Sequence, residues 1–214
     1  MNTSLLAPEY RRVIGAEEIA RLPIRRYEGE IWVVSDTEEL ERALADIRQE
    51  RVVGFDTETR PAFRKGEDYL PCLVQVATAR RVYLLQLRRL DFSRAVTELL
   101  ADRNLVKAGV ALAGDLGQLA RLFPLRPESV VDLGRVAKRH GNHQTGLRNL
   151  TALFLGTRIP KGARTTNWAA PRLSAAQIGY AATDAWAGRE LYLCFERLGL
   201  LAHPDEGVER CEPQ

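Results

Sequence analysis

An apolar segment that ends in two acids, residues 51–58, places the strongest constraint on the fold. It reads Arg-Val-Val-Gly-Phe-Asp-Thr-Glu and predicts a β-strand. Asp56 and Glu58 are two positions apart, and the period of a strand puts both carboxylates on one face. Two neighbouring anions repel, so a divalent cation with a preference for hard oxygen ligands, Mg²⁺ or Mn²⁺, would stabilise the pair. The alternative is that both acids face water at the end of the strand.

Apolar segments and amphipathic segments alternate along the rest of the chain. Strands are expected at 31–34, 72–78, 82–87, 104–110 and 130–133, and helices at about 36–47, 93–102, 112–123, 146–156 and 174–198. The basic pair Arg80-Arg81 between two apolar segments predicts a hairpin, and hence antiparallel pairing. Strands that come first, with helices interleaved later, predict a mixed α/β domain.

Two loops and two chain ends complete the expected organisation. Residues 59–70 and 157–173 carry proline, glycine and several charges, which is typical of loops. Residues 1–30 are expected to form an N-terminal arm, residues 31–200 the main domain, and residues 201–214 a C-terminal tail.

The composition narrows the class of protein. Apolar residues make up 45% of the chain and charged residues 28%, which is the profile of a soluble globular protein and excludes collagen-like or wholly disordered chains. No segment reaches the roughly 18 apolar residues that a membrane helix needs. The net charge of +3 is compatible with a polyanionic partner without requiring one.

The chain start and the cysteines bear on the compartment. Residues 1–12 have no apolar core of signal-peptide length, so secretion is not expected. Cys72, Cys194 and Cys211 are widely spaced and follow neither a metal-site nor a disulfide pattern. Together these features predict a cytoplasmic protein.

Two further acids stand alone in apolar surroundings. Asp115 lies in a glycine-rich apolar segment and Asp184 in an apolar helical one; a buried carboxylate in such a place must be paired, capped or metal-bound. Tyr180 precedes Asp184 by four residues, which places both on one helix face. The alternatives are a helix cap for Asp115 and a core tyrosine bonded to an acid for Tyr180.

In their order along the chain, three motifs resemble those of the DEDD superfamily of exonucleases. They are Phe55-Asp56-Thr57-Glu58, Gly109-Val110-Ala111-Leu112-Ala113-Gly114-Asp115 and Tyr180-Ala-Ala-Thr-Asp184. The tyrosine subtype, which includes ribonuclease D and the exonuclease domain of the Werner-syndrome helicase, is the better match, because Gly179 stands where the other large subtype has histidine. The resemblance covers about residues 31–198.

The resemblance implies a fold and an activity. The fold would be the ribonuclease H-like exonuclease fold, an α/β architecture with a mixed central sheet flanked by helices. The activity would be metal-dependent 3′-5′ hydrolysis of terminal phosphodiesters, releasing nucleoside 5′-monophosphates with two divalent ions, Mg²⁺ or Mn²⁺. The substrate would be a single-stranded or overhanging 3′ end of RNA or DNA, with the choice of sugar open. A homo-oligomer or protein partner also stays open.

The resemblance also implies roles for five residues. Asp56 would bridge both ions, Glu58 and Asp184 would hold the ion that carries the attacking water, and Asp115 would support the second ion through water. Tyr180 would orient the attacking water, since an ordinary tyrosine pKa near 10 makes it a poor base at neutral pH.

Nucleic-acid contacts are expected from the loop at 157–173 and from motif one. The loop carries Arg158, Lys161, Arg164 and Arg172 with Trp168 and no acid, so its charges would bind phosphates. Trp168 would stack on a base or fill the core. Thr57 is expected to face away from its acidic neighbours and to contact the terminal nucleotide through its backbone. A second basic loop carries Arg60, Arg64 and Lys65. Its charges would either contact phosphates or be solvated.

Three rival interpretations stay open. His140 and His143 suggest zinc, but no second pair of ligands accompanies them, and we assign that loop no role. A non-catalytic nucleic-acid-binding module on the same fold is a second possibility, disfavoured by the full set of acids. A metal nuclease that cuts internally is the third.

Overall fold

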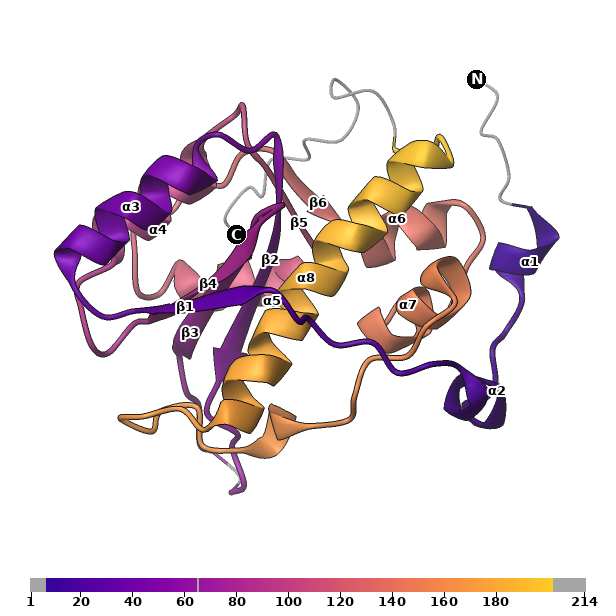
Figure 1. Cartoon of the computed structure of the whole chain (residues 1–214), viewed down its shortest axis with the longest axis horizontal. Helices are drawn as coiled ribbons and strands as arrows, with labels where there is room; N and C mark the ends of the chain where they lie inside the picture. Colours follow the sequence, from indigo (N-terminus) through magenta and orange to yellow (C-terminus); the bar gives the residue numbers. More distant parts are fainter. Residues whose placement is uncertain (1–6, 65, 202–214) are drawn as a thin grey trace.

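A mixed six-stranded sheet forms the centre of the computed structural model, which describes residues 7–64 and 66–201 (Figure 1). Its strands are β1 (Glu30–Val34), β2 (Val52–Thr59), β3 (Pro71–Ala77), β4 (Arg81–Gln86), β5 (Val106–Gly109) and β6 (Val130–Asp132), in the order β1-β4-β3-β2-β5-β6. Strand β3 runs antiparallel to both neighbours, and the other pairs are parallel. The predicted mixed α/β class and the predicted β3–β4 hairpin are confirmed.

Helices cover the sheet and lie beside it. They are α1 (Pro8–Arg11), α2 (Ala16–Arg21), α3 (Thr37–Ile47), α4 (Ser93–Ala101), α5 (Leu112–Leu119), α6 (Leu133–Arg139), α7 (Leu147–Leu155) and α8 (Ala175–Arg197), with a short 3₁₀ turn at Ala163–Thr165. The expected helix at 112–123 ends four residues early, because the chain tightens into a turn in which the Leu119 carbonyl accepts from the amides of both Leu122 and Phe123.

Helix α6 was not predicted from the sequence. The expected strand at 130–133 ends one residue earlier, and Asp132 serves as the N-cap of α6. Its Oδ1 accepts from the amides of Gly134 at 2.9 Å and Arg135 at 3.3 Å. A carboxylate in this position satisfies helix donors that would otherwise lack partners.

Both faces of strand β2 are buried, each against a different layer. Val53 and Phe55 belong to the apolar cluster that includes residues of α3, α4 and α5. On the other face, Gly54 lies against the backbone of α8, where an added Cβ would stand 1.8 Å from the Ala185 carbonyl oxygen. Figure 1 shows α8 crossing the sheet on the side opposite α3 and α4. Glycine therefore lets the helix lie directly on β2.

The described part of the expected N-terminal arm is anchored to the body. Ile14 and Ile19 are buried in a cluster with Ala152 of α7, and Ile24 forms a parallel bridge with Arg158. Cys72 and Cys194 are buried free thiols, whereas Cys211 and most of the expected tail lie outside the described residues. Within residues 7–64 and 66–201, no helix has the length and apolar character needed to cross a membrane.

Candidate active site

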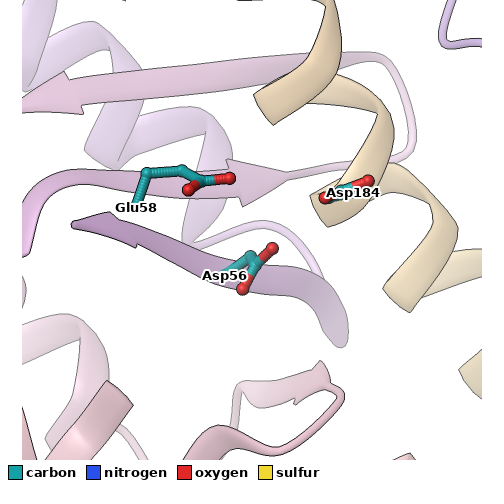
Figure 2. A group of neighbouring side chains, drawn as sticks. All are labelled: Asp56, Glu58 and Asp184. Atoms are coloured by element: carbon teal, nitrogen blue, oxygen red, sulfur yellow. The ribbon is translucent and has the colours of Figure 1, made fainter. Parts of the chain in front are cut away.

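Three carboxylates from two elements meet beside the centre of the sheet. Asp56 and Glu58 of β2 and Asp184 of α8 each offer an oxygen, and these oxygens all lie within 4.8 Å of one another. Figure 2 shows the carboxylates of the strand facing Asp184 across the gap between β2 and α8. Glu58 and Asp184 are both 8% exposed. The structure therefore brings together three of the four predicted acids.

The local sequence explains this convergence. Alternate residues of β2 face α8, so Gly54, Asp56 and Glu58 share one side of the strand. The close contact of Gly54 with Ala185 places the neighbouring Asp184 over the same side. The first turn of α8 is fixed by a capping box, in which Ser174 accepts from the Gln177 amide and the Gln177 side chain accepts from the Ser174 amide.

Burial and mutual repulsion raise the pKa values of two of these acids. Burial raises the pKa of Asp184 to about 7. The pKa of Asp56 lies well above its ordinary value, first because of burial and then because of repulsion by Asp184, Asp115 and Glu58. A cluster of this kind is unfavourable when fully ionised and is relieved by a cation.

One buried amide fits the same interpretation. Gln75 lies directly across from Asp56 in the antiparallel β2–β3 pair, so both side chains share one face of the sheet. The Gln75 side chain is fully buried, and neither its Nε2 nor its Oε1 has a hydrogen-bond partner among the described residues. Such a group is unfavourable unless a ligand or water completes the site. Hard carboxylate oxygens beside an unsatisfied amide fit hydrated Mg²⁺ or Mn²⁺.

This electrostatic arrangement predicts a pH-dependent stability. An acid whose pKa is higher in the folded than in the unfolded state keeps its proton longer when folded, so stability falls as pH rises between the two values. For Asp184 that window runs from about 4 to about 7. We expect the protein in EDTA to lose about 2–4 kcal/mol, roughly 5–15 °C in Tm, between pH 4.5 and 8.

Thermal unfolding in EDTA at a series of pH values measures this loss. Millimolar Mn²⁺ at pH 8 should restore most of it, because a bound cation stabilises the ionised acids. Asp184→Asn should flatten the profile. An unchanged slope in that variant would contradict the assignment of the pH dependence to this cluster.

Asp115 stands next to this group but outside it. Asp115 lies in the first turn of α5, on the other face of β2, and its Oδ1 accepts from the Thr57 hydroxyl. Burial raises the pKa of Asp115. The Thr57 amide donates to Asp56 Oδ1 at 3.0 Å. Thr57 thus faces away from Glu58, as predicted, and its two donors link the acids on the two faces of the strand.

Tyr180 lies one turn before Asp184 on α8, with its phenol close to the Asp184 carboxylate. Burial and the neighbouring acids raise the pKa of Tyr180 above its ordinary value, so the phenol stays protonated at neutral pH. Its ring packs against Gly162, where an added Cβ would meet Cδ2 at 2.8 Å, and lies 6.1 Å from the Trp168 ring. Tyr180 is therefore a protonated phenol that its ring packing holds at the edge of the acid group.

The basic loop residues occupy different environments. Trp168 is 1% exposed and packs in the core cluster with Leu73, the second of its two expected settings. Arg158 donates from Nε to the Leu22 carbonyl at 3.0 Å and so holds the N-terminal segment. Lys161 is exposed. Arg164 lies in the 3₁₀ turn.

Neither histidine belongs to a metal site in the described chain. The Nε2 atom of His140 lies 2.9 Å from the Leu200 carbonyl oxygen, which ties α6 to the end of α8. The described residues contain one group of three or more candidate ligands, and it is Asp56, Glu58 and Asp184. In the second basic loop, Arg60 stacks 4.7 Å over Tyr69, and Lys65 lies outside the described residues.

Sequence reasoning missed Gln75. A usable signal was present, because Gln75 is the one side chain in the apolar segment 71–77 that carries an amide. Its importance depends on the register of β3 against β2, which places it beside Asp56 rather than against the other layer.

Comparison with known proteins agrees with this geometry. A family profile described as 3′-5′ exonuclease matches residues 31–199. Ribonuclease D of Gluconacetobacter diazotrophicus is 34% identical over 171 residues, 78% of this chain and 42% of its own length. The bifunctional 3′-5′ exonuclease and ATP-dependent helicase WRN of Mus musculus is 33% identical over 154 residues, 69% of this chain and 11% of its own length.

Solved structures agree on the fold. The exonuclease domain of Aedes aegypti Nibbler has a TM-score of 0.72 at 21% identity, covering 85% of this chain and 95% of that domain. The Brucella melitensis NrnC structure bound to pGG has a TM-score of 0.62 at 25% identity, with 84% of each chain covered. The expected ribonuclease H-like fold is confirmed. The chain spans between about a tenth and a half of the length of the first curated relatives it matches.

Proposed function

This chain belongs to the 3′-5′ exonuclease family, and we propose that it hydrolyses the terminal phosphodiester at the 3′ end of RNA or DNA, releasing nucleoside 5′-monophosphates. The observation that carries this proposal is the convergence of Asp56, Glu58 and Asp184 within 4.8 Å. The position of Tyr180 one turn before Asp184, with its phenol close to that carboxylate, supports a place in the tyrosine subtype.

The acids would hold two divalent ions, Mg²⁺ or Mn²⁺. Asp56 would bridge the ions, Glu58 and Asp184 would complete one site, and Asp115 would support the other through water. Ions held there would neutralise charge on the scissile phosphate and make water a stronger nucleophile at neutral pH. The raised pKa values of Asp56 and Asp184 and the unsatisfied amide of Gln75 support this role.

The protein's own residues would position the reactants. Tyr180, protonated and fixed by its ring packing, would orient the attacking water at one edge of the acid group. Thr57 would keep Asp56 and Asp115 in register through its amide and hydroxyl, which leaves its carbonyl for the terminal nucleotide. Lys161, exposed in the loop before Tyr180, would contact backbone phosphates. Arg164 would contribute in the same way.

The proposed substrates are single-stranded or overhanging 3′ ends. A related structure, Brucella melitensis NrnC, is bound to pGG, which extends the proposal to short oligonucleotides. We further propose that the protein acts in the cytoplasm and that a second copy or a protein partner adds contacts to the substrate.

A time course on matched RNA and DNA oligonucleotides labelled at the 5′ end tests the function. In Mn²⁺ or Mg²⁺ we expect a ladder that shortens from the 3′ end and is lost in EDTA. Tight binding without any ladder would favour a non-catalytic binding module instead. Cleavage of a circular single strand would favour an internal nuclease, because an exonuclease needs an end.

Tyr180→Phe should lower kcat by about 10–100-fold with little change in KM, because the variant keeps the ring packing and loses the donor that orients water. Steady-state kinetics on a single-stranded oligonucleotide measure this effect. Tyr10→Phe is the control, since the Tyr10 ring stacks on Phe154 and should change kcat less than twofold. The shape of the pH profile should be the same in Tyr180→Phe. A lost rising limb in that profile would contradict a positioning role and indicate a general base, because a base must be deprotonated to act.

A further inference from the structure

A cavity lined by arginines lies beside the proposed active site. Its volume is about 470 Å³, and its walls are Arg88, Arg89, Arg172, Gln86, Cys72 and residues 168–171. We call it the arginine pocket. Three arginines line it, and no acidic residue does so among the described residues. The sequence interpretation placed Arg172 in a basic loop but assigned nothing to Arg88 or Arg89.

These arginines have no acidic partner in the described chain. Elsewhere in the chain arginines meet acids, as in the pairs Arg121–Asp68 at 2.7 Å and Arg51–Glu196 at 2.8 Å. No ion pair of the described residues includes Arg88, Arg89 or Arg172, and all three are exposed. Like charges gathered at one cavity repel, and a bound anion offsets that repulsion.

The pocket is built on fixed backbone rather than on a free loop. The Leu87 amide donates to the Cys72 carbonyl and the Arg89 amide to the Gln86 carbonyl, each at 2.9 Å. Gln86 is 5% exposed, and its amide donates to the Ala170 carbonyl at 3.3 Å. This bond joins the loop that carries Arg172 to the end of β4. The three arginines therefore come from two segments whose relative position is fixed by hydrogen bonds.

The sheet register gives the separation between Glu58 and Gln86, the residue of the pocket wall that belongs to the sheet. Glu58 pairs with Leu73, and Leu73 pairs with Gln86. Glu58 and Gln86 thus lie on the same face, two strands apart, which is about 10 Å at the usual strand spacing. Trp168 lies between the arginine pocket and the acid group, because it lines the pocket and its ring centre lies 6.1 Å from that of Tyr180.

We propose that the arginine pocket binds a backbone phosphate of the substrate strand, about two linkages upstream of the scissile bond. Neighbouring phosphates along a strand lie about twice as far apart as the 3.4 Å axial rise of stacked nucleotides, so about 10 Å corresponds to at most two linkages. Guanidinium groups match phosphate in shape and charge. The inference rests on the proposed function and sets a preferred substrate length of at least four nucleotides.

The triple variant Arg88→Gln/Arg89→Gln/Arg172→Gln tests this proposal. Its kcat/KM is compared with that of the wild type on single strands of two to eight nucleotides with 5′-hydroxyl ends, so that only internal phosphates are present. In the wild type kcat/KM should rise at least tenfold between two and five nucleotides. In the variant, kcat/KM should be at least tenfold below the wild-type value on eight nucleotides and less than threefold below it on two nucleotides.

Arg126→Gln is the matched control. Arg126 is exposed and precedes β6, at the amino-terminal end of that strand, whereas the acids of β2 lie toward the carboxyl end of a strand that runs the same way. It should change kcat/KM less than twofold at every length. The proposal is overturned if kcat/KM of the triple variant falls by the same factor at all lengths. It is also overturned if kcat/KM on eight nucleotides is unchanged.

Binding separates this inference from the proposed hydrolysis. Fluorescence anisotropy of Asp56→Asn with oligonucleotides of the same lengths, in Ca²⁺, should show affinity rising with length only while the three arginines are present. That result would support phosphate binding at the arginine pocket even if the wild type hydrolysed no substrate. Affinity independent of length in both backgrounds would overturn it.

Discussion

Asp56→Asn should abolish 3′-end hydrolysis, with a loss of about 10³-fold or more in kcat, while the fold remains intact. Asp56 belongs to the acid group, and burial, followed by repulsion from Asp184, Asp115 and Glu58, raises its pKa. An amide of the same shape keeps the packing but removes the negative charge that would hold two cations together. The labelled oligonucleotide assay measures the loss directly.

The same substitution should stabilise the protein in EDTA. Removing one of several mutually repelling buried acids relieves an unfavourable interaction, so Tm at pH 8 should rise by several degrees. Divalent ions should then raise Tm less than they do in the wild type. Glu38→Gln is the control, since Glu38 is exposed on α3 beside Arg42, and it should alter neither property. More than a tenth of wild-type activity in Asp56→Asn would contradict the central role of this acid.

Much of the site follows from local periodicity. The period of a strand places Asp56 and Glu58 on one face, and the helical spacing places Tyr180 one turn before Asp184 on the same helix face. The structure keeps both pairs. Strand positions and the hairpin were predicted to within a few residues because their apolar patterns are short and bounded by charge or glycine.

What could not be predicted depends on contacts between distant segments. Nothing in the local pattern around Gly54 indicates that a helix carbonyl will lie against it, yet this contact places Asp184 over the strand. Asp132 closes an apolar segment and resembles the end of a strand, whereas its carboxylate caps α6. Gln75 and the arginine pocket acquire significance only through the register of β2, β3 and β4.

Gly54→Ala should lower the folding free energy by about 2–4 kcal/mol. Molecules that still fold should lose most of their activity. The added Cβ would meet the Ala185 carbonyl oxygen at 1.8 Å and the Arg189 amide nitrogen at 3.0 Å. Both are backbone atoms of α8, so no side-chain rotation relieves the contact, and the helix must move away from β2. Asp184 moves with it, which separates the three carboxylates that would hold the ions.

Denaturant unfolding and the exonuclease assay measure the two effects. Gly117→Ala provides the matched control, because Gly117 lies in α5 with no atom within 4 Å of an added Cβ, and alanine there should stabilise the helix by up to about 1 kcal/mol. Ala185→Gly should not rescue Gly54→Ala, since the clash is with the carbonyl rather than with the methyl group. A Gly54→Ala protein with wild-type stability and activity would show that α8 can shift without loss, and would contradict the role of this contact in aligning the acids.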